Sequence, residues 1–138
     1  MTVWVHRRPL LAGAILAAAL ALALPLAAHA EDYAGGAVKS MQTAKGEVLT
    51  DQKGMTLYTF DKDGKDASSC YDACAAKWPP LAADASAKAE APFSLVTRKD
   101  GSRQWAHEGK PLYLWQADKK PGDMGGDGVG GVWHVAKD

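Results

Sequence analysis

The sequence lacks an excess of either charge, because its 138 residues include 16 Lys and Arg and 16 Asp and Glu. A chain without a strongly basic face has little to attract nucleic acid, so we expect no nucleic-acid partner. With 47% hydrophobic and 23% charged residues, the composition is that of an ordinary globular protein. It excludes a disordered, a collagen-like and a polytopic membrane protein.

Recognised catalytic signatures are missing as well. The sequence contains no glycine-rich phosphate loop of known spacing, no G-x-S-x-G elbow and no histidine pair with a local carboxylate. It also lacks C-x-x-C-H, which excludes a c-type haem. We therefore expect a protein that is not an enzyme and that has no cofactor.

The longest apolar run lies near the N-terminus. Residues 6–8 are positively charged, residues 10–28 are rich in Ala and Leu, and an A-H-A step precedes Glu31. This pattern predicts a cleavable signal peptide at residues 1–30, with the general and the twin-arginine export routes both open. An uncleaved anchor is the alternative, but Pro25 and the small residues favour cleavage. We expect one periplasmic or secreted domain at 31–138, without a stable membrane anchor.

The chain contains an internal repeat. A shift of 55 residues, as from Leu57 to Leu112, aligns many Gly, Tyr, Asp and Trp residues. The aligned pairs include Gly46 with Gly101, Gly54 with Gly109, Tyr58 with Tyr113, Asp63 with Asp118, Asp72 with Asp127 and Trp78 with Trp133, while Phe60 meets Trp115. The pattern predicts two repeats, at about 38–81 and 93–136, that share one fold.

Within each repeat the pattern predicts a three-stranded antiparallel meander with glycine turns, and a last strand follows the second meander. The predicted strands span 38–43, 48–50, 55–60, 93–97, 103–107, 112–115 and 133–135. The fold class is therefore all-β and mainly antiparallel.

An irregular arm follows each third strand. In the first repeat, residues 70–77 favour a short helix that stops before Pro79. In the second repeat, the glycine-rich residues 122–131 exclude a stable helix. The Ala-rich residues 82–91 between the repeats are typical of a solvated linker.

Cys70 and Cys74 are the chain's 2 cysteines. An oxidising compartment favours a disulfide between them, and so short a loop would stabilise the fold by about 2 kcal/mol. The alternative is a redox-active dithiol or a copper site that also uses His134. Zinc has the right number of ligands if His107 joins them, but the spacing argues against it.

Acidic loops surround each repeat's third strand. Asp61, Asp63 and Asp66 flank Gly64, and a second group comprises Asp118, Asp123 and Asp127. Calcium binds such loops outside cells, but neither group matches the full twelve-residue calcium loop. Asp is also a common turn residue, so we favour Asp63 and Asp118 as caps of the strand ends. We expect no metal site, with His134, Asp61 and Asp63 as the weak candidates.

Aromatic pairs are the most regular signal in the sequence. Two residues apart on a strand, side chains point to the same face, and in each repeat such a pair is followed by an Asp three residues later. The residues concerned are Tyr58, Phe60 and Asp63, then Tyr113, Trp115 and Asp118, with Trp78 and Trp133 at the ends of the arms. The rings form either a buried core or an exposed platform for a sugar, a peptide or a haem-like ligand, and the core is favoured.

Together these residues resemble a bacterial family of secreted or lipoprotein repeats with a Yx(F/W/Y)xxD motif. The resemblance also rests on C-Y-D-A-C-A-A-K-W-P-P-L at residues 70–81 and G-D-G-V-G-G-V-W-H-V at residues 126–135. It implies no activity and no catalytic residues. Many relatives are lipoproteins, but this chain lacks the lipobox cysteine.

We therefore expect a non-enzymatic binding or envelope-associated module for an unknown small molecule or envelope component. The alternative is a copper-handling or thiol-redox periplasmic protein that uses Cys70 and Cys74.

Overall fold

The computed structural model describes residues 2–3 and 31–138. Apart from residues 2–3, the predicted signal peptide at 1–30 lies outside the described residues. No helix in the described part of the chain is long and apolar enough to cross a membrane.

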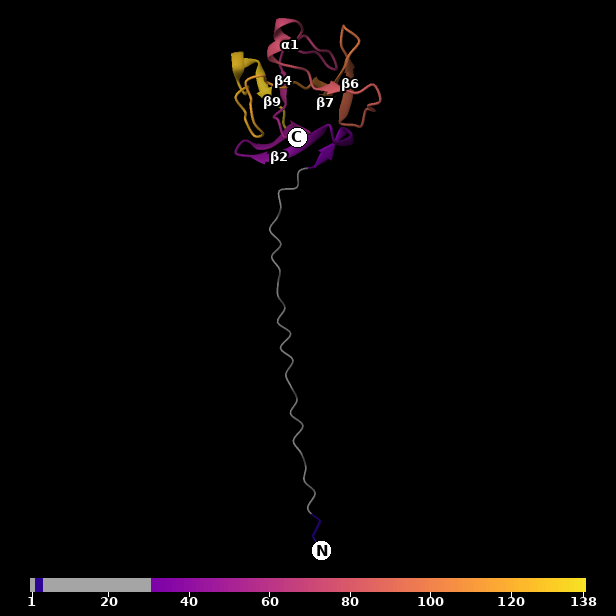
Figure 1. Ribbon diagram of the computed structural model, residues 1–138, viewed down its shortest axis with the longest axis vertical. Helices are drawn as coiled ribbons and strands as arrows, with labels where there is room; N and C mark the ends of the chain where they lie inside the picture. The colour runs from indigo at the N-terminus through magenta and orange to yellow at the C-terminus, as the bar shows by residue number, and fades with distance from the viewer. Residues whose placement is uncertain (1, 4–30) are drawn as a thin grey trace.

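The described chain is built mainly of antiparallel strands in three sheets (Figure 1). β1, β2 and β3 form one sheet, β4 and β9 a second, and β5, β7 and β6 a third, with β8 also paired to β7. The strands are β1 Asp32–Tyr33, β2 Val38–Thr43, β3 Gly46–Asp51, β4 Tyr58–Phe60, β5 Ala82–Ala83, β6 Phe93–Thr97, β7 Arg103–His107, β8 Lys110–Pro111 and β9 Trp133–Val135. The predicted all-β class is confirmed.

Helical segments are short. They are η1 Ala34–Gly36, α1 Ala73–Lys77 and η2 Val129–Gly131. The predicted helical arm with its disulfide is confirmed by α1 and by the bond between Cys70 and Cys74. In Figure 1, α1 and β2 lie on opposite sides of the folded part, with β4 and β9 between them.

The first two strands of each repeat form the predicted hairpins. β2 pairs with β3 from Val38 and Asp51 to Thr43 and Gly46, and β6 pairs with β7 over its whole length. Gly46 has a φ of 94°, which a residue with a side chain rarely adopts, so the turn requires glycine there. The third strands differ from the prediction.

Only Tyr58–Phe60 of the predicted strand 55–60 is regular, and the predicted strand 112–115 is not a regular strand. The reason is that this second segment divides its hydrogen bonds among several partners. The N–H of Leu112 donates to Trp105 O, that of Tyr113 to Tyr58 O, and that of Leu114 to Pro79 O. The prediction of a solvated linker at 82–91 is also wrong at its start, where β5 pairs with β7.

The two repeats interlock, because each gives its last segment to the other. Ala136 N donates to Leu57 O at 2.8 Å, and Leu81 N donates to Leu112 O at 2.9 Å. The two contacts are equivalent under the repeat and run in opposite directions between the copies. The structure therefore has an approximate two-fold axis, and neither repeat completes its own sheet.

One strand departs from the ungapped register. Leu57 N donates to Leu49 O in the first repeat, whereas Leu112 N donates to Trp105 O in the second. Trp105, and not Gln104, is therefore the structural counterpart of Leu49. The reason is that the loop before β7 is one residue longer than the loop before β3.

Two buried clusters form the core. One holds the aliphatic side chains and Trp105, including Val38, Leu49, Leu57, Phe93 and Leu112. The other is aromatic and holds Tyr58, Tyr113, Trp78 and Trp133, with Cys70 beside them. The motif residues that the sequence singles out thus meet in the second cluster.

Candidate functional site

Each motif tyrosine donates a hydrogen bond to the aspartate of the other repeat. The Tyr58 hydroxyl donates to Asp118 Oδ2 at 2.5 Å, and the Tyr113 hydroxyl donates to Asp63 Oδ2 at 2.6 Å. The two tyrosines also exchange backbone hydrogen bonds of 2.8 and 3.0 Å, which places them at the two-fold axis. The motif is therefore assembled between the repeats and not within one of them.

Burial perturbs the acid–base behaviour of these pairs. Both tyrosines are 0% exposed. Burial, followed by the hydrogen bond to the partner carboxylate, raises the pKa of Tyr58 and that of Tyr113. Burial also raises the pKa of Asp63, although its bonds from Tyr113 and from the backbone N–H of Ser69 oppose the shift.

Four rings form a continuous stack through the same centre. Phe60 lies 4.2 Å from Trp133, Trp133 lies 3.8 Å from Trp78, and Trp78 lies 4.0 Å from Trp115, between ring centroids. The interplanar angles are 9°, 4° and 31°. The two inner rings are buried, and the outer rings of Phe60 and Trp115 are half-buried.

The tyrosines meet the stack edge-on. Tyr58 lies at 77° to Trp78, with 5.3 Å between the centroids, and Tyr113 lies at 89° to Trp133, with 5.1 Å. Edge-to-face geometry places the positive ring edge on the negative ring face, which is favourable. The favoured core position of Tyr58, Tyr113, Trp78 and Trp133 is therefore observed.

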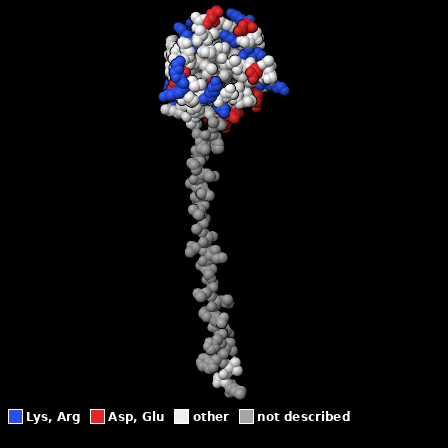
Figure 2. Space-filling view, in the orientation of Figure 1, with Lys and Arg blue, Asp and Glu red and all other residues white. Residues whose placement is uncertain are grey.

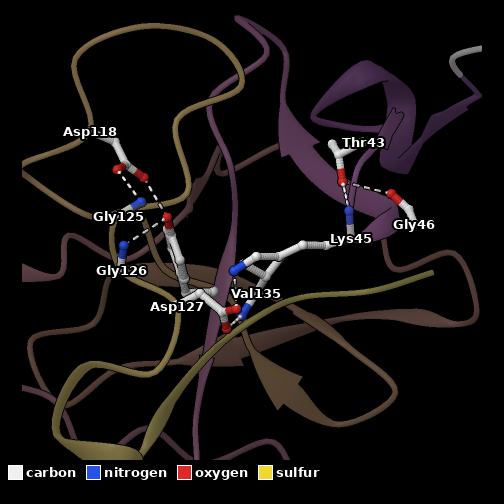
Figure 3. Close-up of polar contacts among 9 residues, drawn as sticks. Thr43, Lys45, Gly46, Asp118, Gly125, Gly126, Asp127 and Val135 are labelled. Atoms are coloured by element: carbon white, nitrogen blue, oxygen red, sulfur yellow. Dashed lines mark hydrogen bonds and ion pairs between the residues drawn. The ribbon is translucent and has the colours of Figure 1, made fainter.

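The glycine-rich arm closes over Tyr58 (Figure 3). The N–H of Gly125 donates to Asp118 Oδ1 at 3.0 Å, and that of Gly126 donates to the Tyr58 hydroxyl at 3.2 Å. Asp127 then anchors the arm, since Val135 N and Lys45 Nζ both donate to its carboxylate. These bonds hold a segment that has little regular structure of its own.

The disulfide arm closes over Tyr113 in a different way. Ser68 Oγ lies 2.7 Å from the Tyr113 hydroxyl and accepts a bond from Arg98 Nη1 at 3.0 Å. Arg98 is buried and also donates to Cys70 O at 2.7 Å. The two ends of the site are therefore similar in the tyrosine and aspartate but differ in charge, because only Tyr113 has an arginine in its network.

The comparisons with known proteins agree with this interlocked pair. A family model described as a secreted repeat of unknown function matches residues 39–82 and 94–137. The chain belongs to this family. No curated protein and no solved structure matches it. As a secreted repeat protein, the chain is consistent with the export that its leader predicts.

An open cavity lies at each end of the stack of this secreted repeat protein. The cavity at Phe60 has a volume of about 400 Å³, and the cavity at Trp115 has a volume of about 240 Å³. The first is lined by charged residues, among them Asp61, Lys65, Glu108 and Lys110. The second is lined mainly by the less polar Met55, Thr56, Pro79 and Leu114, with Asp51 and Asp118 at its edge.

Thr56 distinguishes the cavity at Trp115. Its side chain is 1% exposed, and Oγ1 is a buried polar atom without a hydrogen-bond partner in the described structure. Leaving a buried hydroxyl unpaired costs about 1–3 kcal/mol. The repeat places Pro111 at the equivalent position of the other cavity, so this feature belongs to one end alone.

The candidate metal residues lie outside the aromatic centre. His134 Nε2 lies 2.8 Å from Asp61 Oδ2 on the surface, and both line a cavity of about 440 Å³ with His107. No group of three or more His, Cys, Asp or Glu side chains in the described chain is placed to hold a metal ion. Asp63 and Asp118 instead accept the tyrosine hydroxyls, and Cys70 and Cys74 are joined in the disulfide.

Sequence reasoning missed several members of this site. Thr56, Ser68, Arg98 and Gly126 were not among the predicted site residues. The repeat alignment contains a signal for Thr56, because it differs from Pro111 at an otherwise similar strand. The positions of the other three depend on loops whose course the sequence pattern does not define.

Proposed function

We propose that this secreted repeat protein acts in the periplasm as a non-enzymatic binding module. Its ligand is a small, mainly neutral molecule or envelope component with one flat face and at least one hydrogen-bonding group. The site is the cavity at Trp115. The observation that supports it is the buried hydroxyl of Thr56, which lacks a partner in a cavity that a ligand could fill.

The properties of the cavity limit the ligand. A volume of about 240 Å³ is below the usual 300–1,000 Å³ of drug-sized sites, so a monosaccharide or a single aromatic ring is the appropriate size. The half-buried Trp115 ring offers an apolar surface for stacking. Asp51 already accepts the N–H groups of Lys53 and Met55, which reduces its attraction for a cation.

Thr56→Val tests the proposal directly. The variant keeps the shape of the side chain and removes the unpaired hydroxyl, so we expect the free energy of unfolding to rise by about 1–2 kcal/mol. Ligand binding should weaken by at least about tenfold, since a lost hydrogen bond costs about 1.4 kcal/mol or more. Chemical denaturation and titration of the secreted protein with N-acetylglucosamine and with benzamide measure the two effects.

Phe60→Ala is the matched control, because it alters the equivalent ring at the other cavity. Binding of either probe at the Trp115 cavity should survive in this variant and be lost in Trp115→Ala, as nuclear magnetic resonance shifts of the Met55 and Thr56 amides would report. If neither probe shifts those amides, or if Thr56→Val binds as tightly as the unaltered protein, the proposed site is wrong.

A further inference from the structure

The ring stack is tighter than ordinary core packing requires. Aromatic pairs in proteins usually prefer offset or edge-on arrangements with centroids about 4.5–7 Å apart. Here three successive pairs have centroid distances of 4.2, 3.8 and 4.0 Å. Such distances bring the π-electrons of neighbouring rings into direct contact, and indole and phenol are the side-chain rings that lose one electron most readily.

We propose that Trp115, Trp78 and Tyr58 form a relay that carries one oxidising equivalent from the surface to Tyr58. A one-electron oxidant, such as a small free radical, takes an electron from Trp115. Trp78 then reduces Trp115, and Tyr58 reduces Trp78. The O–H bond of Tyr58 breaks, its proton moves to Asp118 Oδ2, and the products are a neutral phenoxyl radical, a protonated Asp118 and the oxidant reduced by one electron.

The stack determines where the oxidant reacts. Trp78 is 4% and Trp133 is 5% exposed, so the outer rings are the ones that a small oxidant reaches. Phe60 occupies the other end, and its benzene ring gives up an electron far less readily than indole does. The two-fold symmetry is therefore broken at this position, and the relay begins at Trp115.

Charge determines where the relay ends. Removal of an electron leaves one more positive charge at the site, which a nearby cation disfavours. The Tyr113 hydroxyl is joined through Ser68 to the buried guanidinium of Arg98. The Tyr58 hydroxyl instead contacts Asp118 and the Gly126 N–H, and Tyr58 also packs on Trp78, the ring next to Trp115.

The relay is independent of the proposed ligand and can be tested without it. The chain has 4 tyrosines, and Tyr33→Phe with Tyr71→Phe leaves only Tyr58 and Tyr113. The secreted protein with these two substitutions is mixed with tris(bipyridine)ruthenium(II) and persulfate, illuminated and frozen. Electron paramagnetic resonance then distinguishes a tyrosyl from a tryptophan radical.

We expect a tyrosyl signal in this background protein. Tyr58→Phe should remove most of it, while the matched Tyr113→Phe should keep it. Trp115→Phe should also remove it, whereas Trp105→Phe, outside the stack, should not. Asp118→Asn takes away the proton acceptor and should leave the radical on tryptophan, unlike Asp63→Asn. Near-ultraviolet circular dichroism of the coupled indoles checks that each variant is folded.

Three results would overturn the relay. A background protein without a tyrosyl signal would show that oxidation stops before Tyr58. An unchanged signal in folded Trp115→Phe would show that the oxidant does not use the stack. A signal lost in Tyr113→Phe and kept in Tyr58→Phe would place the end of the relay at the other tyrosine.

Discussion

At the scale of single residues, the motif aspartates serve the opposite repeat. Asp118 is buried, and it accepts the hydroxyl of Tyr58 and the N–H of Gly125. A buried carboxylate needs such donors, because an unpaired charge away from water is costly. The tyrosine hydroxyl and the aspartate therefore depend on each other across the two-fold axis.

Replacing Tyr113 with Phe tests this dependence. The variant keeps the ring against Trp133 but leaves Asp63 without its hydroxyl donor, so we expect a loss of about 1–3 kcal/mol in the free energy of unfolding. Urea denaturation measures it. Tyr71→Phe is the control, since Tyr71 is only partly buried and its hydroxyl accepts one long bond, from Lys99 N at 3.3 Å. Equal stabilities of the two variants would contradict the prediction.

The raised pKa values of Tyr58 and Tyr113 predict sensitivity to alkaline pH. A phenol ordinarily titrates at 10.0, and in the folded protein the pKa of both is higher. Above pH 10 the unfolded chain releases protons that the folded chain keeps, so stability is complete below that pH and falls as pH rises. Each tyrosine contributes a slope of up to about 1.4 kcal/mol per pH unit.

The slope is measured by urea denaturation at a series of pH values on both sides of 10. In the double variant with Tyr58→Phe and Tyr113→Phe, we expect the alkaline slope to decrease by up to about 2.7 kcal/mol per pH unit. Tyr33 stays in both proteins, so its contribution cancels. The same slope in both proteins would show that these phenols titrate alike in the folded and unfolded chains.

At the scale of elements, the glycine-rich arm is shaped by the rings that it covers. A Cβ on Gly126 would lie 2.8 Å from Trp78 Cη2 and 2.9 Å from Tyr58 Cε1. Both atoms belong to rigid buried rings that cannot move aside. The arm therefore needs glycine at this point for close approach and not for a special backbone angle.

Gly126→Ala should for this reason destabilise the fold by about 1–3 kcal/mol, as overpacking of a core does. Gly64→Ala is the matched control, because its Cβ would meet only Ala67 Cβ, at an ordinary 3.5 Å. Thermal unfolding of the two variants measures the difference. If Gly126→Ala unfolds at the temperature of Gly64→Ala, the rings have more room than the structure indicates.

Several elements were predictable from the sequence, since local pattern was enough to define them. The hairpin β6 and β7, the strand β9 and the helix-bearing arm lie where alternation, glycine turns and Pro79 place them. The segment 112–115 was not predictable in the same way. Its apolar pattern is that of a strand, but the partners that it pairs with come from distant parts of the chain.

At the scale of the whole molecule, neither repeat can fold alone. The first repeat lacks the partner of Leu57, which is Ala136, and the second lacks the partner of Leu112, which is Leu81. The stack also alternates between the repeats, because Trp133 lies between Phe60 and Trp78. Cooperative folding therefore requires both copies.

Separate expression of residues 31–92 and 93–138 tests this requirement. We expect each fragment alone to be unfolded, and an equimolar mixture to regain the near-ultraviolet circular dichroism of the intact protein. The stability of the mixture should increase with concentration, since association is part of its folding. A cooperative unfolding transition in either isolated fragment would contradict the interlocked architecture.

The surface of the molecule shows no region of one sign on the face in Figure 2, where Lys and Arg alternate with Asp and Glu. This distribution matches the equal numbers of basic and acidic residues in the sequence. It supports a small neutral ligand over a highly charged one, because long-range attraction depends on a field that balanced charges cancel.

The sequence by itself determined the repeat, the antiparallel class, the hairpin positions and the cysteine pair, because each depends on neighbours in the chain. It also identified the tyrosines, tryptophans and aspartates that matter. Only the tertiary structure decided that Tyr58 pairs with Asp118 and Tyr113 with Asp63, and that Trp78 and Trp133 meet in one stack. The reason is that an internal alignment shows which residues are equivalent, whereas the exchange of final segments between repeats decides which residues touch.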